Sequence, residues 1–481
     1  MNTFRSNFPI FFSSLFFICL LIYFISTNQS LFLILIPIAL LILYASIFQT
    51  KLLFVSIAFL TPFSVNIEEY TDGVGLFIPT EPILFGLLLL FIFFQTQKKV
   101  IANKTLKHPI VLSIFVYLFS LFICSITSTS PIISFKFLLS KLWFIIPIVF
   151  LGSIYFKEKN IIRLFLFLFV FSVFIVVLYT VINHASYDFG EQEGHWVMWP
   201  FFKDHTIYGA IIAMALPLAI GLLFSKQHDI FFKCFYGVII LVILIGLYFS
   251  YTRAAWLSVV GAIFVFLFLK YKVKFKYLFA TAICMLAIIF ISWDKIQMEL
   301  KRNKFEHTTE EFSERIQSAA NVSTDASNLE RINRWECAIE MFKERPVFGF
   351  GPGTYAFEYA RYQKPESLTI ISTNFGNMGN AHSEYLSALS ETGIIGFFSF
   401  ILVVAVIFYR SIILYLKTKE LERKTLLLFM ILSLSTYFIH AFLNNFLDTD
   451  KAAVPIWGIC AMVIALEKSL LDEKESTILH N

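Results

Sequence analysis

Long apolar runs, separated by short polar segments, follow one another along most of the 481-residue chain. A helix of roughly 20 apolar residues crosses the hydrocarbon core of a bilayer, so each run predicts a membrane-spanning helix. The fourth run contains Glu81 and Pro82, which leaves a merged or re-entrant segment open there. The pattern predicts about 14 spans, at Pro9–Ile25, Leu31–Phe48, Leu52–Val65, Leu76–Phe94, Pro109–Ile126, Leu142–Phe156, Leu164–Ile182, Ile207–Phe224, Phe235–Tyr251, Ala254–Leu269, Tyr277–Trp293, Ile394–Leu414, Thr425–Phe442 and Ala452–Leu466.

The composition excludes an ordinary soluble protein. Hydrophobic residues make up 58% of the chain and charged residues 15%, whereas a soluble domain carries roughly a quarter of its residues as charges. The mean hydropathy is +0.77. We therefore expect an all-α polytopic membrane protein, with about 12–14 transmembrane helices and one large, partly helical extracytoplasmic loop. The net charge of +5 gives no indication of nucleic-acid binding.

The basic residues set the expected orientation, because Lys and Arg in short loops stay on the cytoplasmic side. They fall in alternate loops, at Arg5, Lys51, Lys98–Lys107, Lys157–Arg163, Lys226–Lys233, Lys270–Lys276 and Lys417–Lys424. Both termini are therefore expected in the cytoplasm, with Lys136 and Lys141 as exceptions on the outer side. We expect the first run to be a retained span rather than a signal peptide. The six cysteines show neither a disulfide framework nor a CxxC metal spacing.

One polar segment, residues 294–393, is too long for a simple connector and is expected outside. Within it, Asn328–Phe342 has apolar residues at helical spacing, with Arg331 and Arg334 on other faces, and predicts a helix lying against the membrane surface. The expected organisation is an N-terminal transmembrane bundle (1–293), this loop (294–393), C-terminal transmembrane helices (394–467) and a cytoplasmic tail (468–481). We find neither a repeat of solenoid length nor the paired halves of many transporters.

His382 is the first candidate for chemistry. It follows Asn380, a good N-cap residue, and precedes the periodic Tyr385 and Leu386, so we expect it in the first turn of a helix. The helix dipole there disfavours an imidazolium, and a neutral imidazole is what a general base needs. The alternative is a structural histidine that caps the helix.

Basic groups mark the outer ends of two other spans. Arg253, in "YTRAAW", either reaches the lipid headgroups or binds an anion, for which its planar fork suits phosphate oxygens. The segment "FKDHTIYGA" forms either an interfacial belt with flanking charges or a polar rim for a headgroup, with the polar residues Lys203, Asp204 and His205.

Two further segments combine glycine or polar residues. "GFGPGTY" (Gly349–Tyr355) lacks the Gly-Lys-Ser/Thr of a nucleotide loop, and either shapes a turn or directs the N–H groups near Gly351 and Gly353 towards a cleft. In the segment after His440, polar residues at membrane depth predict a face lining the interior. Its Asp448 and Asp450 are interpreted as a loop end, and we assign no metal and no cofactor.

Four of these stretches resemble, in order, the O-antigen ligase and O-antigen polymerase superfamily, whose members are membrane glycosyltransferases. They are "FKDHTIYGAIIAMALPLAI", "YTRAAW", "RINRWECAIEMFKERPVFGFGPGTY" and "NAHSEYLSALSETGIIG". The resemblance covers most of the chain after about Asn183 and is specific as a set. This chain departs from the family pattern near His205, where the family often has Asn, and it has one or two extra spans.

The resemblance implies a bacterial inner-membrane enzyme that takes glycans from undecaprenyl diphosphate on the outer side of the membrane. It implies a catalytic histidine at His382, an intramembrane arginine at Arg253 and a loop-helix arginine at Arg331. The acceptor would be lipid A-core in a ligase, or another lipid-linked glycan in a polymerase. We further expect substrate binding, in contact with membrane lipids, by Lys203, His205, Arg334, Tyr385, Gly351, Gly353 and His440.

Two other classes remain open from the sequence. A transporter, either a flippase for lipid-linked oligosaccharide or a small-anion carrier, would use Arg253 and the polar face near His440 as a pathway. A non-catalytic membrane component of capsule assembly would carry the same spans without transferring a glycan.

Overall fold

The computed structural model describes residues 48–68, 75–98, 100–225, 228–273, 326–365 and 379–479, and the single positions 44, 368 and 372. The chain divides into two compact units, Met1–Phe54 and Val55–Asn481. The packing described below lies within the second unit. The predicted spans Pro9–Ile25 and Tyr277–Trp293, and most of Leu31–Phe48, fall outside the described residues.

Almost all regular structure in the described part is helical. Two short strands, β1 (Val65–Asn66) and β2 (Phe77–Ile78), pair antiparallel. The α-helices are α3 Thr50–Phe63, α4 Thr80–Gln97, α5 Asn103–Leu106, α6 Pro109–Ile126, α7 Pro131–Tyr155, α8 Lys159–Ala185, α9 His205–Ser225, α10 Ile230–Tyr248, α11 Arg253–Lys270, α14 Ala326–Glu344, α15 Tyr355–Glu358, α16 Glu384–Lys417, α17 Leu421–His440 and α18 Asp450–Leu479. Single 3-10 turns occur at Glu193–His195 and Tyr359–Tyr362.

Nine helices in the described residues are long and apolar enough to span a membrane, namely α4, α6 to α11, α16 and α18. The protein is thus an all-α polytopic membrane protein, as the apolar runs predict. The run at Pro109–Ile126 matches α6 at both ends. The run at Leu52–Val65 forms α3, which at 14 residues is shorter than a full span. The run interrupted by Glu81 forms α4, which begins at Thr80 after β2.

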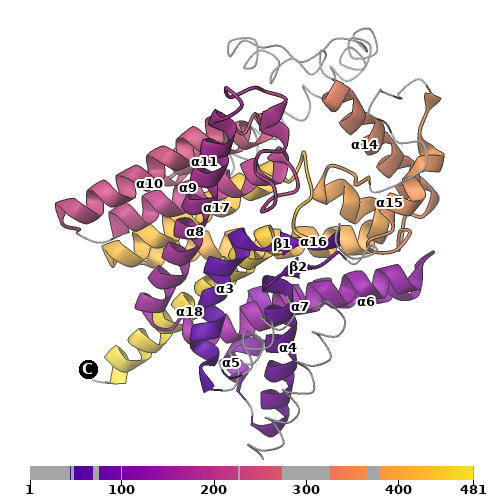
Figure 1. Ribbon diagram of the computed structural model, residues 1–481. Helices are drawn as coiled ribbons and strands as arrows, with labels where there is room; N and C mark the ends of the chain where they lie inside the picture. Colours follow the sequence, from indigo (N-terminus) through magenta and orange to yellow (C-terminus); the bar gives the residue numbers. More distant parts are fainter. Residues whose placement is uncertain are drawn as a thin grey trace, which may run out of the picture. The chain divides into compact units, whose positions relative to one another are not determined.

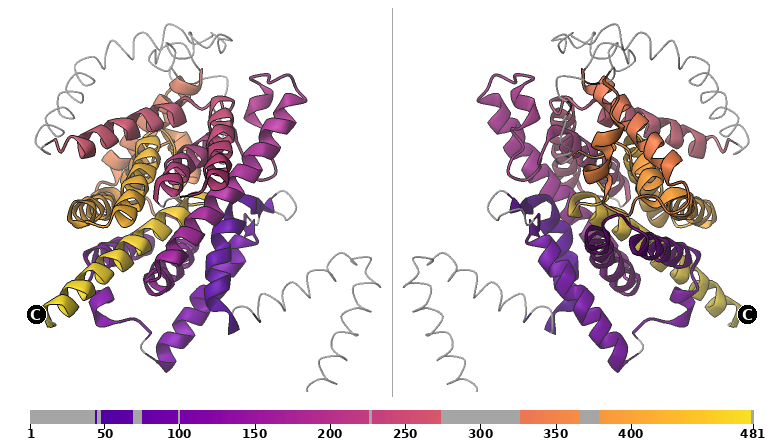
Figure 2. Two further views of the ribbon diagram at one scale, coloured as in Figure 1. Left: turned by 90° about the vertical axis from the view of Figure 1, so that its left-hand side faces the viewer. Right: turned by 90° about the vertical axis from the view of Figure 1, so that its right-hand side faces the viewer.

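The helices that matter for the candidate site pack against one another. α17 lies along α9 and α11, whereas α16 packs on α6 and α14 (Figure 1). α18, in yellow, packs along α7 (Figure 2). α16 contains a break at Gly393, whose φ of 60° is outside the helical region. A side chain there would come within 2.4 Å of the Val347 carbonyl oxygen. The break separates the first turns of α16 from the long apolar run that begins at Ile394.

Lys141, an exception to the expected charge distribution, is not a loop residue. It lies in the middle of α7, is 2% exposed, and forms an ion pair with Asp448. Its ammonium group also donates to the Leu447 carbonyl at 3.2 Å. The positive-inside rule applies to basic residues in solvent-exposed loops. A lysine that is buried within the helix bundle and paired with an acid therefore carries no information about membrane orientation.

Replacing Lys141 by methionine should destabilise the protein, because it leaves Asp448 beside the bundle without its partner. Because the Asp448 carboxylate is 38% exposed and therefore screened by solvent, the loss of this half-buried ion pair should cost about 1 kcal/mol. Melting of the detergent-solubilised protein, followed by size-exclusion chromatography, measures the effect. Lys136→Met changes an exposed lysine on the same helix and should melt like the wild type. The double change Lys141→Met with Asp448→Asn should recover part of the loss, and a double variant as unstable as the single one would contradict this account.

Candidate functional site

His382 lies just before α16 and not inside it. Its φ of 46° is left-handed, an uncommon conformation for a residue other than glycine. The N-cap of α16 is Ser383, whose hydroxyl accepts from the Leu386 N–H at 3.4 Å. The prediction that Asn380 caps the helix and that His382 sits in its first turn is therefore wrong. The Asn380 side chain instead accepts from the His382 N–H at 3.0 Å and fixes the turn.

Helix α14 holds the His382 turn from the other side. The Trp335 indole donates to the His382 carbonyl, and Arg334 donates to the Asn380 carbonyl, both at 3.3 Å. Arg334 is buried, pairs with Glu330 at 2.7 Å and covers the Tyr359 ring at 4.8 Å. The contacts of Arg334 are thus with the protein, and they position the turn that carries His382.

The predicted helix around Asn328–Phe342 exists as α14, and one of its faces packs on protein. Cys337, Ala338 and Met341 are fully buried against Phe350 and the aromatic residues of the following segment. Burial raises the pKa of the Cys337 thiol to about 12, which keeps this thiol protonated and unreactive. The helix therefore serves as a rigid wall beside the His382 turn.

Asn444 connects two histidines from distant parts of the chain. Its amide nitrogen lies 3.0 Å from Nε2 of His440, the last residue of α17. Its amide oxygen lies 3.5 Å from Nδ1 of His382. His440 and Asn444 are almost completely buried. An amide that donates to His440 and accepts from His382 leaves the proton of His382 on Nδ1 and the lone pair on Nε2.

Two arginines of α14 and the start of α11 lie near the imidazoles of His382 and His440. Arg331 of α14 lies within electrostatic range of both His382 and His440. The backbone of Ala254 lies against His440, which brings the start of α11, and with it Arg253, to the same place. Burial, together with the positive charges of Arg331 and Arg334, lowers the pKa of His382 from 6.5 to about 4. The imidazole is therefore neutral at physiological pH.

The start of α9 joins the same region. The Thr252 hydroxyl, just before α11, donates to the His205 carbonyl at 2.7 Å. Asp204 caps α9 through the Thr206 and Ile207 N–H groups at 2.8 and 3.1 Å, and its carboxylate lies within electrostatic range of His440. The His205 ring stacks on His195, with 4.2 Å between centroids. Arg331, His382 and His440, which come from separate stretches of the sequence, thus lie near one another. Arg253 is the first residue of α11, whose backbone at Ala254 lies against His440.

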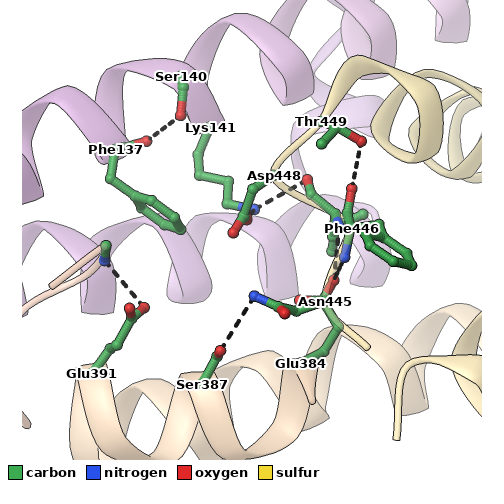
Figure 3. Close-up of polar contacts among 12 residues, drawn as sticks. Phe137, Ser140, Lys141, Glu384, Ser387, Glu391, Asn445, Phe446, Asp448 and Thr449 are labelled. Carbon is green, nitrogen blue, oxygen red and sulfur yellow. Dashed lines mark hydrogen bonds and ion pairs between the residues drawn. The ribbon is translucent and has the colours of Figure 1, made fainter. Parts of the chain in front are cut away.

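Glu384 holds the segment that carries Asn444. One of its carboxylate oxygens accepts from the Tyr437 hydroxyl at 2.8 Å. The same oxygen accepts from the N–H groups of Phe446 and Leu447 at 2.8 and 2.7 Å, in the segment that carries Phe446 in Figure 3. Its own N–H donates to the Ala441 carbonyl at 2.9 Å. Glu384 was not among the residues predicted from the sequence. The signal was an acidic side chain two positions after the candidate histidine, in the first turn of a helix.

The glycine-rich turn binds a side chain of the protein itself. Gly349, Gly351 and Gly353 all have positive φ, which explains the choice of glycine. The N–H groups of Gly353 and Tyr355 donate to the Glu391 carboxylate at 3.1 and 3.0 Å. Figure 3 shows the Glu391 carboxylate with one of these contacts. The Gly351 N–H donates to the Glu391 carbonyl at 2.7 Å. Of the two sequence-based alternatives, the turn-shaping one fits this geometry, because these N–H groups are not directed into a cleft.

The other predicted residues lie in different places. The Tyr385 hydroxyl donates to the Phe438 carbonyl at 3.0 Å, and its ring packs on Phe442, so it links α16 to α17. Lys203 lines a cavity next to β1 and β2. The two acids of the Asp-x-Asp pair make separate contacts: Asp448 pairs with Lys141, and Asp450 accepts from the Ser64 hydroxyl.

Part of the chain that contains candidate site residues is similar to known proteins. A family model described as O-antigen ligase matches residues 237–401, which include Arg253, Arg331 and His382. The chain is also similar to an uncharacterized protein of Haemophilus influenzae, with 29% identity over 125 residues. That match covers 26% of this chain and spans about 30% of the length of the relative.

Proposed function

We propose that the protein transfers a glycan from undecaprenyl diphosphate to a sugar hydroxyl, because residues 237–401 match a family model described as O-antigen ligase. The reaction would take place on the outer side of the bacterial inner membrane, in the synthesis of a cell-surface polysaccharide. The acceptor would be lipid A-core or a second lipid-linked glycan. The observation that carries the proposal is the meeting of His382 with Arg331, and of both with the start of α11, around Asn444 and His440.

In this mechanism, Nε2 of His382 accepts the proton of the acceptor hydroxyl while that oxygen attacks the anomeric carbon of the donor glycan. The bond between the anomeric carbon and the diphosphate oxygen breaks, and undecaprenyl diphosphate leaves with the electron pair. Asn444 supports the step because its contact with Nδ1 leaves Nε2 free of a proton. A diphosphate is an activated leaving group, so a weak, well-placed base suffices, and positioning supplies much of the acceleration.

The arginines would hold the diphosphate. Arg253 is the first residue of α11, and a helix N-terminus favours an anion through its free N–H groups and its dipole. Arg331, on α14, lies within electrostatic range of both histidines. Two guanidinium groups at the leaving oxygens stabilise the negative charge that develops as the glycosidic bond breaks.

The pH dependence of transfer should follow the low pKa of His382. A base acts in its neutral form, so activity should persist from neutral pH down to about pH 5 and fall below about pH 4, where the imidazole gains a proton. An ordinary histidine would already be half protonated at pH 6.5. Measurement of kcat/KM against pH in detergent tests this, and a profile that declines from pH 7 with a midpoint near 6.5 would contradict it.

The direct test of the proposed function uses purified protein with lipid-linked glycan in detergent. A transferase makes a longer or newly attached glycan without a membrane potential and without a second compartment. A flippase or anion carrier makes no new bond under these conditions. Mass spectrometry of the glycan decides between them, and recovery of unchanged donor with every acceptor offered would exclude the proposed reaction.

A further inference from the structure

A cavity of about 330 Å³ opens beside the candidate site, next to the segment that leads into α9. Small-ligand pockets span roughly 300–1,000 Å³, so this volume suits one ring and not an extended chain. Its walls combine aromatic and polar side chains from two parts of the fold, namely Asn66, Glu68, Phe77, Trp199, Phe201 and Lys203.

Both walls of the cavity are held in place by the protein. On one side, Asn66 and Phe77 are paired across the β1–β2 ladder. The Asn66 amide also donates to Glu68 Oε2 at 3.2 Å and accepts from the Glu68 N–H at 3.1 Å. On the other side, the Tyr179 hydroxyl donates to the Trp199 carbonyl at 3.0 Å, and the Phe201 ring packs edge-on against Tyr179 at 5.3 Å. The cavity is therefore largely formed before anything binds.

Two charged side chains that line this cavity, Lys203 and Glu68, are not paired with each other. Within the described part of the chain, Lys203 makes no hydrogen bond and no ion pair, although Glu68 lines the same cavity. The second carboxylate oxygen of Glu68 likewise makes no hydrogen bond there. An ammonium and a carboxylate that share a cavity without touching leave room between them for hydrogen-bonding groups of a ligand.

We propose that this cavity binds one uncharged sugar residue of a glycan substrate, an inference that rests on the proposed function. An aromatic face accommodates the C–H face of a sugar ring, while a carboxylate, an amide and an ammonium accept from or donate to its hydroxyls. The Glu68 carboxylate disfavours a diphosphate in the same space, because like charges repel. Lys203 is followed directly by Asp204, which lies within electrostatic range of His440, so the cavity adjoins the candidate site.

The test compares Trp199→Ala and Glu68→Gln with Trp196→Ala, which removes an exposed tryptophan of the same segment that does not line the cavity. The full-length protein in detergent is assayed for transfer, with the donor varied at saturating acceptor and then the reverse. Loss of one good contact should raise KM by about tenfold, while kcat stays within a few-fold. A rise in the donor series assigns the sugar to the donor glycan, and a rise in the acceptor series to the acceptor. If KM is unchanged in both series, or if Trp196→Ala has the same effect, the proposal is overturned.

A binding measurement separates this proposal from the proposed function. The probe is the oligosaccharide released by mild acid from the donor preparation, observed by saturation-transfer NMR with the same detergent-solubilised protein. We expect a sugar-proton signal with wild type and Trp196→Ala, and its loss with Trp199→Ala. Absence of a transfer product together with this binding pattern would remove the reaction but keep the sugar site. Equal signals from wild type and Trp199→Ala would remove the site.

Discussion

Replacing His382 by alanine should lower kcat for glycan transfer by about 10²–10⁴-fold, the usual contribution of a positioned general base. The physical reason is that Nε2 of His382 carries the lone pair in a neutral ring whose other nitrogen is held by Asn444. Alanine removes the proton acceptor but leaves Asn380, Ser383 and the first turn of α16 unchanged. The measurement is the initial rate of product formation with purified protein, at saturating donor and acceptor.

A matched control uses His228, which lies between α9 and α10 and contacts the Leu222 carbonyl at 3.1 Å, away from the candidate site. His228→Ala should retain the activity of the wild type, and both variants should elute as folded protein in detergent. Asn444→Ala should lower the transfer rate less than His382→Ala does. The proton of His382 is then no longer held on Nδ1, but the imidazole base is still present. A His382→Ala protein that is folded and still transfers glycan at the normal rate would show that His382 is not the base.

The membrane-spanning helices that the structure describes could be predicted from the sequence, and the candidate site residues could be named from it, for different reasons. The apolar runs predict helices because a backbone in lipid must satisfy its own hydrogen bonds, and that requirement is local. The run Pro109–Ile126, which follows a basic loop and starts at a proline, therefore matches α6 residue for residue. The candidate site residues were predicted from separate stretches. In the structure, Arg331 lies within electrostatic range of His382 and His440, and Asn444 links these two histidines.

The errors occurred where a distant partner decides the local structure. Asn380 and Ser383 are both good N-cap residues, and the choice between them depends on the left-handed turn at His382, which Trp335 and Arg334 hold from α14. The glycine turn similarly depends on Glu391, which lies 38 residues from Gly353 in the chain. Lys141 appeared to be a misplaced loop charge because its partner, Asp448, is 307 residues away. Periodicity and local motifs carry no information about such pairings.

Replacing Arg253 by lysine should lower kcat for transfer by about 10²–10³-fold, the cost of losing one donor aimed at developing negative charge. Lysine keeps the positive charge, but as a point charge on a flexible stem, without the planar fork that contacts two phosphate oxygens at once. Arg253 begins α11 beside His440, where its side chain and the helix N-terminus would act on the same leaving diphosphate. The rate of product formation and the KM for the lipid-linked donor are measured together.

The comparison of kcat with KM distinguishes two roles for Arg253. If its fork acts only as the diphosphate leaves, Arg253→Lys lowers kcat and leaves the donor KM within a few-fold of the wild type, because the missing interaction belongs to the transition state. If the arginine only recruits the donor, KM rises while kcat stays constant. Arg361→Lys provides the control, since Arg361 is a half-exposed arginine that pairs with Glu358 at 3.1 Å and touches none of the site residues named above. Full activity in Arg253→Lys would show that a single positive charge is sufficient at the start of α11, and that bidentate contact with the diphosphate is not part of the reaction.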